Sequence, residues 1–544
     1  MPLHLYNSLS KSIQPFTPRD PRHVSFYSCG PTVYDDAHVG NFRSFLAADV
    51  LRRWIESPLC ALANDPEAGR GLGKHAAVGI ARRTVTHVMN ITDVGHMTDD
   101  AEGGENGEDR MAVAGRRLLE AKKSGALPAG VEVDAANPYQ IADFYATRFL
   151  EDARRLGLKV ALEAKQDPTL MPRPTGCIPQ MIAMIELLIA RGHAYAVGAP
   201  QRQVVYFDVQ SFPAYGQLSG NTLDKLRSGA GGRIDQGNQS QKKHPADFLL
   251  WKADPAHIMK WDSPWGPGYP GWHIECSVMA EQRLAALDKG GDGTIDLHSG
   301  GEDNVFPHHE CEIAQTCGCT GNPVFARTWF HPRHLFIEGA KMSKSKGNFY
   351  TARQLMEQGI ELGALRLELI KTHYRTNANF TMQGLADSQR MLQRWRRVAA
   401  AAGATAMTGA ELAAESADAA VLEEFAELMN DDLNVAGALG LINSWTGDLT
   451  APTASDAAAL SVMDDVLGVL SLERLARQTM EIGVYLAGTA PSPEVEERLL
   501  QRRAAREKKD FKRSDTLRDE LAALGYAIKD MAGGRVEISR LGGR

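Results

Sequence analysis

The chain has 544 residues, which at roughly 150 residues per domain is enough for three or four domains. Its net charge of -7 excludes a protein that binds nucleic acid over its whole surface, so such contacts would need a local basic patch. No apolar run approaches the roughly 18 residues of a membrane span, and the N-terminal segment lacks the apolar core of a signal peptide. We therefore expect a cytoplasmic protein that makes no membrane contact.

The N-terminal part alternates strand-like and helix-like segments. "HVSFYSCG" (23–30) predicts a strand, "NFRSFLAADVLRRWI" (41–55) a helix, and "TVTHVMNITDV" (84–94) a second strand. This strand–helix–strand order is typical of a parallel, doubly wound sheet. The Gly- and Ala-rich stretch at 57–83 is too long for a simple connection and predicts a surface insertion. The acidic, glycine-rich stretch at 100–109 predicts a loop.

Further along the chain, a helical region (137–191) is followed by a strand-like segment, "RQVVYFDV" (202–209), and an exposed linker (229–243). The sheet pattern returns at "DFLLWK" (247–252) and continues through "TIDLHSG" and "WFHPRHLFI". After Thr351 the chain is mostly helical. The last 50 or so residues contain a basic helix (501–512) and a short β-like end.

These patterns predict an α/β fold. A Rossmann-like doubly wound parallel sheet is split by an inserted domain and followed by a helical bundle and a small C-terminal α/β domain. The predicted ranges are 1–130 (first half of the split domain, with the insertion 57–83), 131–240 (inserted domain), 241–335 (second half), 336–385 (a lysine-bearing loop and the region after it), 386–490 (helical bundle) and 495–544 (C-terminal domain).

The tetrad His38-Val39-Gly40-Asn41 follows a strand and a turn and opens a helix. A helix N-terminus offers free N–H groups to phosphate, His38 can donate to phosphate oxygens, and Gly40 leaves room for an adenine ring. A capped helix start explains the tetrad equally well.

A second candidate is "GAKMSKSKGN", in which Lys341, Lys344 and Lys346 follow an apolar strand. Three ammonium groups on a glycine-bounded loop can close over a triphosphate. A lysine-rich segment is, however, more often a solvent-exposed loop with no ligand.

The odd number of cysteines argues against a disulfide framework and leaves metal binding, catalysis or plain burial. His308 and Glu312 are four residues apart, so on a helix beginning near Pro307 they share one face. With Cys29 and Cys276, both expected at strand ends, they form a plausible zinc-ligand set. A polar helix start beside two buried thiols remains the alternative. Burial is the default for Cys60 and Cys177, and Cys311, Cys317 and Cys319 are interpreted as structural or incidental.

The helix predicted at 501–512 is the strongest local basic patch. It suits phosphate contacts, and a solvated helix face is the other interpretation. Its basic residues are Arg502, Arg503, Arg506, Lys508, Lys509 and Lys512.

The two loops together resemble the class I aminoacyl-tRNA synthetases, and "KMSKS" is matched letter for letter at 341–345. With "CGPTVYDDAHVGNFRSF", "NITDV", "PGWHIECS", "DLHSGGEDNVFPHHECEIAQ", "THYRTNANFT" and "REKKDFKRSDTLRDEL", the chain is similar to the cysteinyl-tRNA synthetase family over most of its length. The resemblance implies that L-cysteine is activated with ATP to cysteinyl-adenylate and transferred to the 3′ end of tRNA(Cys). It also implies a monomer whose helical bundle (386–490) and C-terminal domain (495–544) bind tRNA.

The resemblance implies a role for each of these residues. One zinc ion would be held by Cys29, Cys276, His308 and Glu312, and would favour a thiolate over a hydroxyl. His38, Gly40, Asn41, Lys341 and Lys344 would bind ATP with Mg²⁺, and all of these except Gly40 would be catalytic. Trp272 would form an apolar wall and Asp303 would receive the ammonium group of the amino acid. The implied substrate-binding residues are Thr92, Trp272, His273, His298 and Asp303.

The sequence departs from the family pattern at several places. Asn41 replaces a histidine and cannot carry charge. Insertions follow Cys60 and Val94, and Val536 stands where tryptophan is common. Two alternatives therefore remain: a mycothiol-pathway ligase that joins cysteine to an amino sugar, and a non-catalytic paralogue that binds tRNA or adenylate.

Overall fold

The structure is a computed structural model. It describes residues 1–65, 83–97, 107–125, 127, 132–221, 241–285, 294–342, 348–402, 419–472, 478–479, 482–485, 492–531 and 535–540. Lys344, Lys346, most of the insertion predicted at 57–83, and most of the linker predicted at 229–243 lie outside these residues.

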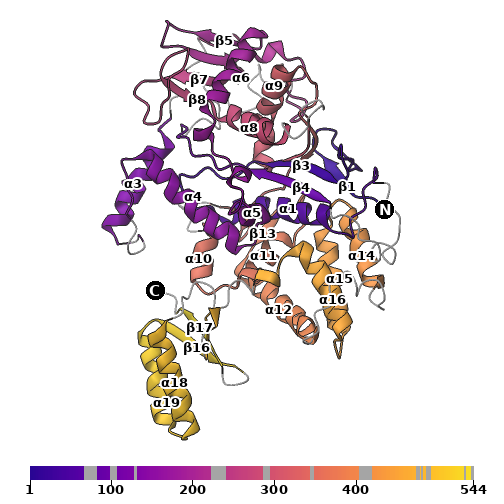
Figure 1. Cartoon of the computed structure of the whole chain (residues 1–544), viewed down its shortest axis with the longest axis vertical. Coiled ribbons are helices and arrows are strands. Elements are labelled where there is room, and N and C mark those ends of the chain that lie inside the picture. The colour runs from indigo at the N-terminus through magenta and orange to yellow at the C-terminus, as the bar shows by residue number, and fades with distance from the viewer. Residues whose placement is uncertain are drawn as a thin grey trace.

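A parallel sheet with the order β10-β9-β3-β4 lies at the centre of the molecule (Figure 1). Its strands are β3 (His23–Ser28), β4 (Thr84–Met89), β9 (Ile295–Ser299) and β10 (Ala326–Phe330). Every neighbouring pair in this sheet is parallel. Helix α1 (Val39–Glu56) connects β3 to β4, and α9 (Glu310–Thr320) connects β9 to β10. The two helices lie on opposite sides of the sheet, which confirms the predicted doubly wound fold.

The N-terminal hairpin, β1 (His4–Asn7) and β2 (Ser12–Pro15), lies beside the β10 edge of this sheet. The Asn7 side-chain amide donates to the Arg327 carbonyl at 2.8 Å, and the Asn7 Oδ1 accepts from the Trp329 amide at 3.1 Å. The hairpin therefore satisfies backbone groups that the edge strand would otherwise leave unpaired.

A separate antiparallel sheet with the order β5-β6-β7-β8 forms the inserted part. Its strands are β5 (Ala194–Val197), β6 (Val204–Phe207), β7 (Phe248–Ala253) and β8 (Gly268–Pro270). Helices α6 (Ile178–Ala190) and α8 (Trp272–Ala280) contact this sheet. Helices α3 (Arg110–Lys123), α4 (Pro138–Arg155) and α5 (Lys159–Glu163) precede it in the chain, and α5 contacts β4 of the parallel sheet.

One sequence expectation is wrong here. We expected "DFLLWK" to continue the parallel sheet, but β7 pairs antiparallel with β6, and the parallel sheet resumes only at β9. A short apolar run predicts a strand without predicting its partner, because burial in either sheet requires the same residues.

The following region is helical apart from a small sheet with the order β12-β11-β13. Its strands are β11 (Leu335–Ile337), β12 (Ala340–Lys341) and β13 (Ala378–Phe380). The helices are α10 (Ala352–Glu357), α11 (Leu362–Ile370), α12 (Met382–Ala399), α14 (Ala419–Asn430), α15 (Val435–Asp448) and α16 (Ala454–Leu467). Among the described helices, none has the length and apolarity required to cross a membrane.

The C-terminal residues form a small α/β unit with its own hydrophobic core, seen in yellow in Figure 1. Its elements are β14 (Gln478–Thr479), β15 (Gly483–Tyr485), α18 (Pro493–Glu507), α19 (Phe511–Ala523), β16 (Tyr526–Asp530) and β17 (Val536–Arg540). Val536, which stands where the family pattern commonly has tryptophan, is buried in this core.

The basic helix predicted at 501–512 is two helices. Helix α18 ends at Glu507, and Lys509 takes a left-handed conformation (φ 59°) before α19 begins. Arg502 is buried and binds Asp530 at 2.7 Å, and Arg506 binds the same carboxylate at 2.6 Å. Two of the predicted phosphate-binding cations are therefore paired within the protein.

His87 on β4 gives the folded state an acid sensitivity that can be tested. The ring is buried, stacks on Phe26 with centroids 4.2 Å apart, and contacts Ser28 Oγ at 2.7 Å. Burial, with a smaller contribution from Arg52, lowers the pKa of His87 to about 3. In the unfolded chain its pKa is about 6.5, so below that pH the unfolded state binds a proton that the folded state excludes.

We therefore expect the contribution of His87 to the free energy of unfolding to fall by about 2 kcal/mol when the pH is lowered from 7.5 to 5. The measurement is the free energy of unfolding of the unmutated protein and of His87→Phe at both pH values. The stability of the unmutated protein relative to the variant should fall by this amount. A difference between the two proteins that stays constant with pH would contradict the assignment.

Candidate functional site

The carboxyl ends of the parallel strands converge on a single cavity of about 560 Å³. Cys29 follows β3, Thr92 follows β4, Asp303 follows β9 and Pro332 follows β10, and all four line the cavity. Ligands of open α/β sheets bind at this edge, where the connections diverge. The cavity is also lined by Trp272 and Cys276 of α8, so the inserted part contributes one wall.

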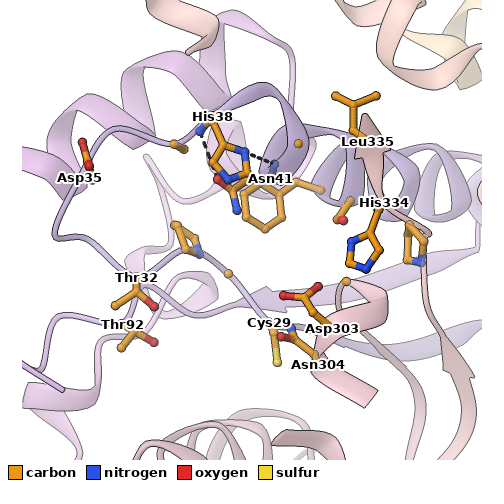
Figure 2. Close-up of a pocket in the computed structure, with 18 of the residues that line it drawn as sticks. Cys29, Thr32, Asp35, His38, Asn41, Thr92, Asp303, Asn304, His334 and Leu335 are labelled. Atoms are coloured by element: carbon orange, nitrogen blue, oxygen red, sulfur yellow. Dashed lines mark hydrogen bonds between the residues drawn. The ribbon is translucent and has the colours of Figure 1, made fainter. Parts of the chain in front are cut away.

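One side of the cavity is the amino end of α1 (Figure 2). His38 is the N-cap, and its Nδ1 accepts from the Asn41 amide at 3.1 Å. In return, the Asn41 Oδ1 accepts from the His38 amide at 3.1 Å, which completes a capping box. Because Nδ1 accepts a hydrogen bond, a neutral His38 ring carries its proton on Nε2.

Gly40 is required at this helix start for steric reasons. A Cβ at residue 40 would lie 3.0 Å from the His38 ring and 3.4 Å from the Met342 Cε. A larger residue would therefore displace the ring that caps the helix. The side-chain oxygen of Asn41 caps the helix, and its NH₂ group is the part of the side chain that can donate a hydrogen bond.

The four predicted metal ligands form a cluster on the other side of the cavity, and Cys29, Cys276 and His308 line it. Ligand atoms of Cys29, Cys276, His308 and Glu312 all lie within 4.8 Å of one another, and all four residues are buried. The two Sγ atoms are 3.9 Å apart, Cys29 Sγ is 3.6 Å from Glu312 Oε1, and His308 Nε2 is 2.9 Å from the same oxygen. We expected Cys276 at the end of a strand, but it lies on helix α8.

Burial and mutual charge shift the pKa values of this cluster in opposite directions. Burial raises the pKa of Glu312, but His298 and His308 outweigh it and lower the pKa to about 2. Burial lowers the pKa of His308, but Glu312 and Cys276 raise it to about 10. Burial, reinforced by Cys276, raises the pKa of the Cys29 thiol. The surrounding Glu312 and Cys276 therefore favour a positive charge at the position of His308.

A second ligand set, Cys29, His298, His309 and Glu312, shares two members with the first and is equally compact. His298 and His309 do not line the cavity, whereas Cys29, Cys276 and His308 do. Only the first set places most of its donors where a bound molecule can reach them. The first set also contains two thiols, which a soft metal ion prefers.

Two predicted substrate-binding residues lie behind the cluster. The His273 ring is 2.8 Å from His308 Nδ1, and His298 Nε2 is 2.7 Å from Glu312 Oε2. Neither residue is among those that line the cavity, and each contacts a predicted metal ligand. Such outer contacts fix the orientation of ligating side chains.

The remaining predicted residues of the pocket do face it. Thr92, Trp272 and Asp303 line the cavity, and the Trp272 ring stacks on His308 with centroids 4.5 Å apart. Figure 2 shows Asp303 and Thr92 on the Cys29 side of the cavity, across from His38.

The lysine-bearing loop begins at the rim of the cavity. Leu335 and Phe336 of β11 line it, and β11 pairs with β12, which ends at Lys341. Met342 lines the cavity as well. The chain therefore enters the KMSKS segment beside the amino end of α1.

Sequence reasoning missed His309. Its Nε2 is 3.2 Å from Cys29 Sγ, and its Nδ1 is 2.7 Å from His331 Nε2. The two adjacent histidines of "PHHE" could have indicated it. The four-residue spacing to Glu312, however, selects only the helix face that carries His308 and excludes His309. Cys311 lies off that face as expected, with its Sγ 3.5 Å from the hydroxyl of Tyr215.

The comparison with known families identifies the class first. Residues 15–61 and 78–390 match the family model described as tRNA synthetases class I (C) catalytic domain. Residues 490–537 match the cysteinyl-tRNA ligase anticodon binding domain. The first match contains both sides of the cavity and the KMSKS segment. The protein is thus a class I aminoacyl-tRNA synthetase, as the sequence predicted.

Relatives extend the match to nearly the whole chain. Cysteine--tRNA ligases of Chlorobaculum tepidum and Thermus thermophilus are each 36% identical, and that of Salinibacter ruber is 39% identical. Each comparison covers 97% of this chain and 97–98% of the relative. Among solved structures, Mycobacterium tuberculosis methionyl-tRNA synthetase with methionyl-adenylate is 14% identical over 83% of this chain and 90% of its own, with a TM-score of 0.49. The chain belongs to the cysteinyl-tRNA synthetase family, and the predicted family and enzyme class are confirmed.

Proposed function

We propose that this protein activates L-cysteine with ATP and transfers the cysteinyl group to the 3′ end of tRNA(Cys). The observation that supports this best is the single cavity, which has a helix N-terminus on one side and, on the other, a buried cluster of two cysteines, a histidine and a glutamate. The first feature suits phosphate, and the second suits a thiol-bearing amino acid once a metal ion is present.

The cluster fits a zinc ion. Four donors around zinc at about 2.0–2.3 Å lie roughly 3–4 Å apart, close to the separations seen between Cys29, Cys276 and Glu312. The charge also fits, because Glu312 and Cys276, the groups that raise the pKa of His308, would equally favour a divalent cation among them. We propose Cys29, Cys276, His308 and Glu312 as its ligands. When bound, zinc would supply a soft acceptor that prefers the substrate's thiolate to a serine hydroxyl.

The other residues bind and orient the two substrates. We propose that Asp303 receives the ammonium group of cysteine, that Trp272 forms an apolar wall, and that Thr92 closes the same side of the pocket. His38 Nε2 and the Gly40 amide donate to the phosphates, since the Val39 and Asn41 amides already bind the Tyr350 carbonyl and His38 Nδ1. Gly40 also keeps the backbone accessible to adenine. The Asn41 NH₂ group adds a donor. Lys341 and Lys344 would meet the phosphates from the loop, together with Mg²⁺.

The reaction then has two steps. The cysteine carboxylate oxygen attacks the α-phosphorus, the bond to the bridging oxygen breaks, and pyrophosphate leaves with that electron pair. In the second step the terminal ribose hydroxyl of tRNA attacks the activated carbonyl, AMP leaves, and the hydroxyl proton passes to a phosphate oxygen. The protein supplies orientation and charge, and no side-chain nucleophile is required.

The two alternatives are less well supported. A mycothiol-pathway ligase is expected to lack the C-terminal region, yet residues 490–537 match an anticodon binding domain. A non-catalytic paralogue would have no need of a complete ligand set beside an intact phosphate-binding helix start. A monomer in the cytoplasm stays a prediction.

The test is cysteine-dependent exchange of pyrophosphate into ATP, followed by charging of tRNA, on zinc-loaded and metal-stripped protein. We expect both reactions with zinc, neither without it, and no response to serine. Exchange without charging of any tRNA would refute the proposed acceptor. The absence of exchange in zinc-loaded protein would refute the activation step and favour the non-catalytic alternative.

A further inference from the structure

Arg43 lies on α1, two residues after Asn41, and is almost completely buried (2% exposed). Among the described residues, its guanidinium group contacts no carboxylate and binds only backbone carbonyl groups. Nε donates to Arg333 at 3.2 Å, Nη1 to Leu369 at 3.2 Å and Thr372 at 3.5 Å, and Nη2 to His373 at 3.1 Å and Thr376 at 2.8 Å.

These carbonyls belong to two segments that contact each other, and the first of them lines the cavity. Arg333 and His334 line the cavity after β10, and the Arg333 amide donates to the Tyr374 carbonyl at 2.7 Å. The segment 369–376 connects α11 to β13, which pairs in parallel with β11. Strand β11 in turn pairs with β12, which ends at Lys341. One side chain therefore ties the phosphate-facing helix to the backbone that leads into the lysine-bearing loop.

Only arginine can make this set of contacts. The five N–H donors of its guanidinium group lie in one fixed plane. A lysine ammonium group has three N–H donors on a single nitrogen and cannot reach carbonyls on several sides. The Leu369 carbonyl lies in the last turn of α11, where intrahelical partners are missing, and three of the others follow the end of that helix. A shorter or less branched cation would leave buried carbonyls unpaired and let the two segments shift.

We propose that Arg43 is a positioning residue for adenylate formation, holding the 332–336 wall of the cavity at a fixed distance from the amino end of α1. The inference rests on the proposed function, because it assigns nucleotide binding to this cavity. A displacement of about 1 Å between such walls is enough to slow a reaction about 100-fold.

The test compares Arg43→Lys with Arg366→Lys. Arg366 is also fully buried, binds the Leu467 and Leu156 carbonyls, and reaches α1 through Asp49. It is not among the residues that line the cavity. For Arg43→Lys we expect the KM for ATP to rise at least tenfold and kcat per active site to fall about 10–100-fold, while the KM for cysteine stays within twofold. For Arg366→Lys we expect lower thermal stability with both KM values unchanged. Unchanged KM for ATP and unchanged kcat per active site in Arg43→Lys would overturn the proposal.

Two further measurements cover other outcomes. If Arg43→Lys does not fold, hydrogen exchange in the unmutated protein decides: amides of 333–338 and 369–376 should be protected to the same degree, and much faster exchange of one segment would overturn the proposal. If the unmutated protein lacks cysteine-dependent exchange, the proposed function fails. The affinity of both variants for a non-hydrolysable ATP analogue then still decides the role of Arg43, with a tenfold loss expected only in Arg43→Lys.

Discussion

Replacing Cys276 with serine should abolish binding of the proposed zinc ion and, with it, the proposed activation of cysteine. The change exchanges a soft, ionisable donor for a hydroxyl inside a buried set whose Sγ atoms are 3.9 Å apart. Loss of an outer contact already costs about 10–100-fold in metal affinity, so loss of a direct ligand should cost at least about 100-fold. We expect cysteine-dependent exchange to fall by at least the same factor.

The measurement is the zinc content of the purified protein together with the rate of ATP–pyrophosphate exchange. Cys311→Ser is the matched control, because Cys311 is equally buried and one residue from Glu312, yet it contacts Tyr215 and neither ligand set. The control should retain one zinc per chain and its activity. A Cys276→Ser protein that keeps both would refute the proposed metal site.

Removing the His38 side chain should slow adenylate formation about 10²–10³-fold while leaving zinc content unchanged. This is the usual effect of losing one donor aimed at charge that develops in the transition state. The ring lies on the α1 side of the cavity, across from the Cys29 cluster, so the two functions are separable. His38→Ala also removes the helix cap, which lowers the stability of the protein by about 0.5–2 kcal/mol. A slower reaction in this variant could therefore come from either the lost donor or the lost cap.

His38→Asn separates the two effects, because asparagine caps helices well but lacks the imidazole. We expect this variant to unfold at nearly the same temperature as the unmutated protein and to remain as slow as His38→Ala in single-turnover adenylate formation. If His38→Asn recovers the full rate, His38 serves only as a cap.

Sequence patterns predicted much of the site because its parts are short and local. The strand–helix–strand pattern placed Cys29 and His38 around the end of β3, and the spacing of His308 and Glu312 placed both on one side of a helix turn. Local patterns did not predict that Cys276 lies on helix α8, that β7 pairs with β6, or that the basic stretch breaks at Lys509. A residue's partner across a sheet and the end of a helix depend on contacts distant in sequence.

The roles of His273 and His298 show the same limit at the level of single residues. Both are predicted to bind the substrate, and the structure places each against a predicted metal ligand and outside the cavity lining. The sequence indicates that a polar residue stands near a site, but whether it lies in front of the ligands or behind them depends on the packing of α8 and β9.

The sequence by itself determined the family and the fold class, because these depend on residue types at short, fixed spacings. It paired His308 with Glu312 in the same way, and the resemblance to the family completed the set of four candidate ligands. Only the tertiary structure decided which of the two overlapping ligand sets opens to the cavity and which groups reinforce it. It alone brought Arg43 to five carbonyls between residues 333 and 376. Metal binding and catalysis depend on where donor atoms converge to within a few ångströms, and segments separated by hundreds of residues converge only when the core packs.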